Sequence, residues 1–117
     1  MIILHCLKKE HYDTLNESKF YGKDKIKKDG FIHCSDLNTF VYVSPNFMIE
    51  NSPLVLLLID TEKVEAPLIW EDFDGNGICY PHLYGELNMD SVVAVVPFLK
   101  DNLGNWIKNE EIKAYEL

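Results

Sequence analysis

Arginine is absent from this chain of 117 residues, and all eleven of its basic residues are lysines. Nineteen acidic residues leave a formal net charge of −8. Binding to duplex DNA or RNA needs clustered cations at the phosphates, so we expect no nucleic-acid partner. The absence also excludes recognition of phosphate by an arginine fork. A nucleotide could still be held by backbone N–H groups and a few lysines, so small phosphate-bearing ligands stay possible.

Cysteines are few and follow no motif: the chain has Cys6, Cys34 and Cys79. Without a C-x-x-C pair, the sequence indicates neither a thioredoxin-type redox site nor a zinc ribbon. The number of cysteines is odd, and the opening residues lack a basic leader. Both observations favour reduced thiols with a structural role. We therefore expect a cytoplasmic protein without a secretory signal.

Long hydrophobic runs are missing as well. The longest run, Leu54 to Ile59, has six residues, whereas a membrane-spanning helix needs roughly 20. The hydrophobic fraction of 47% is that of an ordinary globular protein. The sequence thus predicts one globular domain over residues 1–117, with a core of its own and no contact with a membrane.

Hydrophobic spacing predicts helices only in the first half of the chain. We expect a strand at 2–6, a helix over about 8–18, and an exposed lysine-rich connection at 23–28. A short strand at 31–34 is followed by a helix for which Ser35 is the expected N-cap.

The second half is expected to consist mostly of strands. They are predicted at 54–59, 67–71, 82–85 and 92–97, and the first and last of these are apolar throughout. The predicted fold class is therefore α+β, with mixed or antiparallel sheets and two short helices in the N-terminal half.

The placement of the histidines is the most informative feature. His5, His33 and His82 fall within or beside apolar strands, and side chains two residues apart in a strand share a face. His33 therefore faces the same way as Ser35, and His82 the same way as Tyr84. An unpaired buried polar group costs about 1–3 kcal/mol, so a set of such groups favours a functional cleft. We predict one polar cleft lined by His5, His33, Ser35, His82 and Tyr84.

Three other interpretations of these residues are possible. Each histidine could instead be satisfied separately by a backbone carbonyl. A three-histidine zinc site is disfavoured, because no H-x-H or H-x-x-x-H pair is present, so we expect no metal. A serine hydrolase is disfavoured too, because Ser35 lies in no G-x-S-x-G elbow.

Several segments resemble the domain of unknown function 952 family, which consists of small bacterial proteins with this one domain. They are Leu4-His5, Asp29-Gly-Phe-Ile-His-Cys-Ser35, Leu57-Leu-Ile-Asp60, Trp70-Glu71 and Pro81-His-Leu-Tyr-Gly85. The resemblance runs from about residue 2 to residue 98. It implies an ADP-ribosylation-like fold, in which two small sheets surround a cleft for a nicotinamide nucleotide.

The resemblance also implies roles for individual residues. In the histidine-first class of that fold, a histidine on the first strand binds a ribose of NAD, a place that His5 occupies here. A tyrosine of that class stacks on nicotinamide, for which Tyr84 is the candidate. A glutamate stabilises the oxocarbenium-like transition state; by position Glu71 and Glu86 are the candidates, neither matches a motif, and the role is assigned to Glu71. The tyrosine motif and the late Gln-x-Glu or Glu-x-Glu of the class are not matched.

These observations lead to one main functional hypothesis. The chain would be an enzyme that binds NAD or a related nucleotide as substrate, without a resident cofactor. His33, His82 and Glu71 would be its catalytic residues, and His5, Ser35 and Tyr84 would bind the substrate. The alternatives are a non-catalytic module that senses a small metabolite, and a protein-interaction domain recognisable by a large exposed apolar patch.

Overall fold

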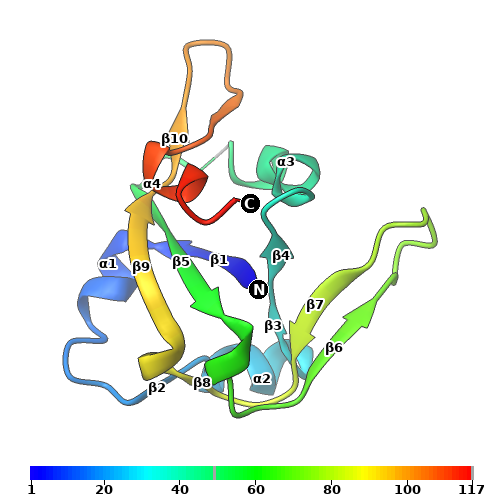
Figure 1. Cartoon of the computed structure of the whole chain (residues 1–117). Coiled ribbons are helices and arrows are strands. Elements are labelled where there is room, and N and C mark those ends of the chain that lie inside the picture. Colours follow the sequence, from blue (N-terminus) through cyan, green and yellow to red (C-terminus); the bar gives the residue numbers. More distant parts are fainter. Residues whose placement is uncertain (49, 117) are drawn as a thin grey trace.

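The largest sheet is built around the apolar run at 54–60. In the computed structural model, which describes residues 1–48 and 50–116, this sheet has the strand order β4–β1–β5–β9 (Figure 1). Its strands are β4 (Ser35–Asp36), β1 (Ile2–Lys8), β5 (Leu54–Asp60) and β9 (Val92–Pro97). All neighbours are antiparallel.

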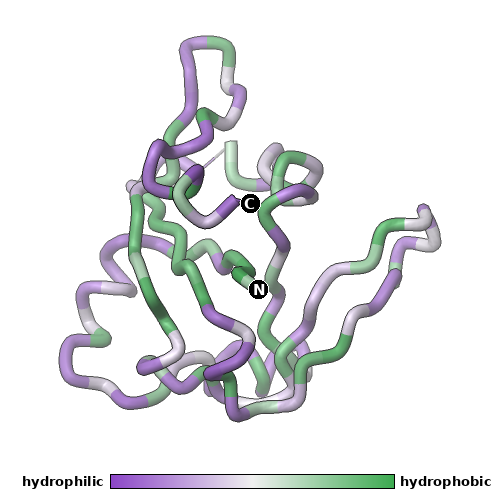
Figure 2. Tube along the Cα trace, in the orientation of Figure 1, coloured by the Kyte–Doolittle hydropathy of each residue, from purple (hydrophilic) through white to green (hydrophobic). Residues whose placement is uncertain are grey.

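Two hydrophobic clusters cover the two faces of this sheet. Leu57 and Ile59 of β5 belong to one cluster, and Leu56 and Leu58 belong to the other. Alternation of side chains along a strand explains the division, because both faces of β5 are buried. Figure 2 shows β5 and β9 as hydrophobic along most of their length.

A second sheet has the order β3–β7–β6 and is also antiparallel. Its strands are β3 (Ile32–His33), β7 (Tyr80–Leu83) and β6 (Leu68–Glu71). Figure 1 shows the hairpin that joins β6 to β7 extending away from the large sheet. Two further strand pairs are β2 (Phe20–Tyr21) with β8 (Leu87–Asn88), and β10 (Leu99–Lys100) with β11 (Trp106–Ile107).

The helices are all short. The α-helices are α1 (Lys9–Asp13), α2 (Lys23–Asp29), α3 (Phe40–Val43) and α4 (Glu110–Lys113). The 3₁₀ segments are η1 (Ser44–Phe47), η2 (Thr61–Lys63) and η3 (Met89–Ser91). The longest helix among the described residues has seven residues, and none of them could cross a bilayer.

The predicted α+β class with antiparallel sheets is confirmed, but the helix predictions need correction. The N-terminal half has three short α-helices instead of two, and the helix expected over about 8–18 ends at Asp13. The segment 23–28, expected as an exposed connection, belongs to α2. Ser35 is no N-cap, because it pairs with Leu4 in the large sheet. Asp36 instead accepts hydrogen bonds from the backbone N–H groups of Asn38 and Thr39.

Candidate functional site

The two main sheets separate along one edge of β1. Strand β4 pairs only with Ile3 and Leu4, and the chain just before it, β3, pairs with β7 instead. Beyond Leu4, this edge of β1 has no strand partner in the described part of the chain. A cavity of about 490 Å³ opens at this point.

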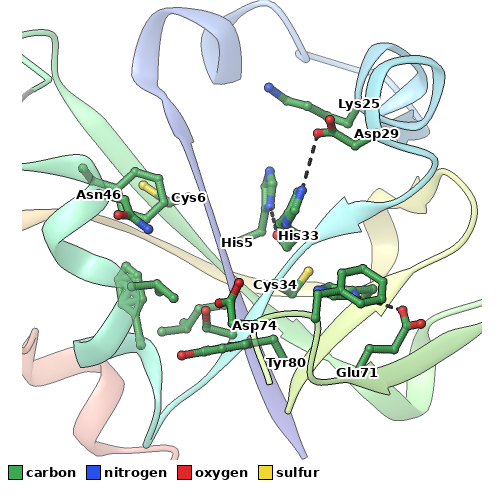
Figure 3. Close-up of a pocket in the computed structure, with 17 residues that line it drawn as sticks. His5, Cys6, Lys25, Asp29, His33, Cys34, Asn46, Glu71, Asp74 and Tyr80 are labelled. Atoms are coloured by element: carbon green, nitrogen blue, oxygen red, sulfur yellow. Dashed lines mark hydrogen bonds and ion pairs between the residues drawn. The ribbon is translucent and has the colours of Figure 1, made fainter. Parts of the chain in front are cut away.

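The structure brings most of the predicted site residues to this first cavity. Its lining includes His5, His33, Ser35, Glu71 and His82. These residues come from β1, β3, β4, β6 and β7, so segments far apart in the sequence meet here (Figure 3). Their proposed catalytic and binding roles stay predictions.

Tyr84 is the exception, because it lies outside the lining of the cavity. Its hydroxyl donates to Glu71 Oε1 at 2.5 Å, and its ring contacts Phe31 with 5.3 Å between ring centroids. The expectation that Tyr84 lines the cleft is therefore not met. Tyr84 reaches the cavity only through Glu71, so it is poorly placed to stack on a ligand.

The His5 ring bridges the gap between β1 and β3. Its Nδ1 lies 2.6 Å from the carbonyl oxygen of His33, and its Nε2 lies 2.8 Å from the hydroxyl of Tyr21. Since a carbonyl can only accept, Nδ1–H is the donor, and the neutral ring accepts from Tyr21 at Nε2. Burial lowers the pKa of His5 to about 4. Both ring nitrogens thus have protein partners, and a hydrogen bond from His5 to a ribose would have to replace the bond to Tyr21.

His82 has one ring nitrogen held by a carboxylate and the other available. Nδ1 lies 3.0 Å from Glu71 Oε1, which also accepts from Tyr84. The hydrogen bond from Tyr84, followed by that from His82, lowers the pKa of Glu71, so this carboxylate is ionised at neutral pH. Nε2 of His82 has no hydrogen-bond partner among residues 1–48 and 50–116. A carboxylate that orients an imidazole in this way is an arrangement suited to general acid–base chemistry.

His33 lies at the outer rim of the cavity, beside His82. The two ring centroids are 5.5 Å apart, and 63% of the His33 side chain is exposed. Nε2 of His33 lies 3.4 Å from Asp29 Oδ2 on α2. Partial burial lowers the pKa of His33, and this effect outweighs the attraction of Asp29. His33 is therefore mostly neutral near pH 7 and can accept a proton from solvent or ligand.

Aromatic rings surround the two histidines. Phe31 stacks on His82 with 4.2 Å between centroids, and Phe73 lies 5.0 Å from His82 on another side. Phe73 and Tyr80 line the cavity, and Phe73 is largely exposed. The cavity thus offers flat apolar surface beside ring nitrogens and carboxylates, a combination typical of small-molecule sites.

Two thiols, those of Cys6 and Cys34, line the cavity. Burial raises the pKa of Cys6 to about 12 and raises that of Cys34 further. Burial therefore favours the protonated form of both thiols at neutral pH, and the thiolate is the nucleophilic form of cysteine. Among the described residues, no group of three or more His, Cys, Asp and Glu side chains is arranged to hold a metal ion.

Sequence reasoning missed several residues of the site. Lys25, Asp29, Asp74 and Tyr80 all line the cavity. Tyr80 precedes His82 by two residues on β7, so the alternation rule applied backwards would have found it. Asp29 and Lys25 carried no signal, because they lie on a helix that hydrophobic spacing did not reveal.

Known structures share this fold. The chain is similar to the crystal structure of protein CC0527 from Caulobacter crescentus, with a TM-score of 0.77 and 26% identity over 92% of this chain and 94% of that chain. The solution NMR structure of the same protein gives a TM-score of 0.71 and 25% identity over 89% and 90% of the two chains. No curated protein matches this chain.

A family model agrees with the resemblance of the motifs. The model described as "Protein of unknown function (DUF952)" matches residues 6–95. This range contains the segment from Asp29 to Ser35 and the segment from Pro81 to Gly85, which provide the histidines at the rim and the back of the cavity. With most of its length matched, the chain belongs to the DUF952 family.

Proposed function

We propose that the first cavity binds the nicotinamide-ribosyl end of NAD or of a related nucleotide, and that the protein acts on its glycosidic bond. The observation that carries the proposal is the His82–Glu71 pair at the cavity wall, with one ring nitrogen oriented by the carboxylate and the other unpartnered in the described chain. The ADP-ribosylation-like fold implied by the motifs is part of this proposal. The separation of two small sheets at β1 supports it.

The charge of the lining favours a cationic ring. Asp29, Glu71 and Asp74 line the cavity, against the single cation Lys25. A pyridinium ring carries a positive charge and two flat faces, so it would interact favourably with these carboxylates and with the faces of Phe73 or Tyr80. The same negative charge would stabilise an oxocarbenium-like transition state at the ribose.

The proposed reaction is transfer of the ribosyl group to a nucleophile, for which water is the simplest acceptor. The bond between the anomeric carbon and the ring nitrogen breaks, and its electron pair neutralises the pyridinium as nicotinamide leaves. The water oxygen bonds to the anomeric carbon, and the proton it loses passes to Nε2 of His82. Glu71 holds His82 in the required tautomer and stabilises the imidazolium that forms.

The other site residues take supporting roles in this proposal. His33 pairs with His82 across β3 and β7, and Ser35 pairs with Leu4 across β4 and β1. Both side chains line the cavity, where they would bind the ribose hydroxyls. His5 is a positioning residue, because its ring fixes the carbonyl of His33 and hence the distance between β1 and β3. Tyr84 positions Glu71.

Calorimetry and product analysis test the proposal. We expect NAD to bind the protein at millimolar concentration or below, and we expect nicotinamide and ADP-ribose as products. His82→Gln should abolish turnover while NAD still binds, because the amide cannot accept the proton. Glu71→Gln should lower turnover less severely, because the amide oxygen can still accept from His82 Nδ1. A circular dichroism spectrum and a thermal melt show that each variant is folded.

Two outcomes contradict the proposal in different ways. If NAD, ADP-ribose and nicotinamide all give no heat of binding, the ligand class is wrong. If NAD binds but is recovered unchanged, the protein is a binding module and the catalytic assignment of His82 is wrong.

A further inference from the structure

A second cavity continues the first along the open edge of β1. It has a volume of about 350 Å³ and shares Cys6, Lys25, Asn46 and Phe47 with the first cavity. Figure 3 places Cys6 and Asn46 on the opposite side of His5 from Glu71. The two cavities therefore form one elongated groove, with the His82–Glu71 pair towards one end.

The two parts of the groove differ in charge. The first part has three lining carboxylates and one lysine, whereas the second is lined by Lys8, His11 and Lys25 against the single carboxylate of Glu50. Glu50 is already engaged, because Lys8 Nζ lies 3.7 Å from its Oε2. Lys25 makes no ion pair within residues 1–48 and 50–116. Asp29 lies one turn further along α2 but is engaged with His33, 3.4 Å from its Nε2. A half-buried lysine that makes no ion pair, at the junction of the two cavities, is suited to an anionic group of a ligand.

The backbone of β1 adds a donor at the same junction. Lys9 N–H donates to the carbonyl oxygen of Pro53, next to β5. Backbone groups of neighbouring residues in an antiparallel strand alternate between the two edges, so Cys6 directs its N–H and C=O to the other edge. That edge is open beyond Leu4, and Cys6 lines both cavities. The Cys6 N–H is therefore available to a ligand in the groove.

We infer that the second cavity is a phosphate subsite, in which Lys25, with the Cys6 N–H, holds the 5′-phosphate of a nucleotide whose ring occupies the first cavity. This inference rests on the proposed function and specifies its substrate class: phosphorylated nucleotides are preferred over nucleosides. The two ends of the groove complement a ligand that is cationic at its ring and anionic at its phosphates. His11 of α1 also lies at this second end.

The test compares two ligands that differ only in the 5′-phosphate, nicotinamide riboside and nicotinamide mononucleotide. By calorimetry at low salt, we expect the mononucleotide to bind about tenfold more tightly than the riboside. Lys25→Gln should reduce this preference to about threefold or less without weakening the riboside. Lys27→Gln serves as the matched control, since Lys27 lies on the same helix but lines neither cavity. High salt should also reduce the preference.

The possible failures are distinguishable. If both compounds bind equally, or if Lys25→Gln weakens both to the same extent, the phosphate subsite is wrong while the proposed function stands. If Lys27→Gln reduces the preference as much as Lys25→Gln, the effect is one of general charge and the subsite is again wrong. If neither compound binds, the proposed function fails and the subsite fails with it.

Discussion

At the scale of single residues, the two buried strand histidines, His5 and His82, have their ring nitrogens paired in different ways. A buried imidazole is costly unless its nitrogens are paired. His5 meets this requirement entirely within the protein, through His33 and Tyr21, whereas His82 meets it at only one nitrogen, through Glu71. The histidine with an unpartnered nitrogen is therefore the better candidate for chemistry, and the fully paired one is the better candidate for support.

His5 makes the stability of the fold depend on pH. Its pKa in the folded protein is about 4, below the ordinary value of 6.5, so the unfolded chain binds a proton more readily. The free energy of unfolding therefore falls as the pH drops from about 6.5 towards 4, and it is unaffected by His5 above this range. At pH 5 the loss attributable to His5 is about 2 kcal/mol.

Urea unfolding of the wild type and of His5→Gln at about pH 7 and about pH 5 checks this prediction. The variant should lose about 2 kcal/mol less than the wild type between the two conditions. His33→Gln is the comparison: the pKa of His33 is also lowered, but its ring is more exposed, so it should flatten the dependence less. Equal pH dependence in His5→Gln and the wild type would show that His5 is not held neutral.

Alternation along strands indicated which neighbours share a face with each histidine, but neither that the histidines meet nor what each one binds, and Tyr84 lies outside the cavity that His82 lines. The rule placed His33 and His82 on shared faces with Ser35 and Tyr84, and it needed only the local sequence. His33 and Tyr21, the partners of His5, lie 28 and 16 residues away in the sequence, and Glu71, the partner of His82, lies 11 residues away. Such partners depend on how the strands are ordered in space, and no local pattern encodes that order.

At the scale of elements, strands were predictable and helices were not. The sequences of β5 and β9 are apolar throughout, which is typical of strands with both faces buried. Their assignment as strands therefore followed from the local sequence alone. The helix α2 has one apolar residue, Ile26, among lysines and aspartates, so hydrophobic spacing could not reveal it. Its signals are the glycines at its two ends, Gly22 and Gly30, which both adopt the left-handed conformation.

The two glycines allow a matched test of how α2 is attached. Both have positive φ, of 103° and 87°, so alanine is strained by about 1–2 kcal/mol at either position. A Cβ at Gly30 would meet open space, whereas a Cβ at Gly22 would overlap Ile32 Cδ1 in the core. We expect Gly22→Ala to cost about 1–3 kcal/mol more than Gly30→Ala in urea unfolding. Equal costs would mean that α2 can shift freely away from β3.

At the scale of the whole molecule, the core extends past the region that the family model matches. That model ends at residue 95, but Trp106 and Ile112 belong to the hydrophobic cluster that also contains Phe40. Trp106 lies edge-on to Phe40 with 4.7 Å between centroids, and Phe40 in turn lines the first cavity. The C-terminal segment therefore packs behind Phe40 and supports one wall of the proposed ligand groove.

Two isoleucines of this segment provide the test. Ile112 on α4 is fully buried in the cluster, whereas Ile107 on β11 is 43% exposed. Ile112→Ala leaves a cavity beneath α4 and should cost about 2–5 kcal/mol, while Ile107→Ala should cost about 1 kcal/mol or less. Urea unfolding followed by fluorescence measures both, because Trp106 reports on the same cluster. If both substitutions cost equally little, the C-terminal segment only rests on the surface, and the wall formed by Phe40 stands without it.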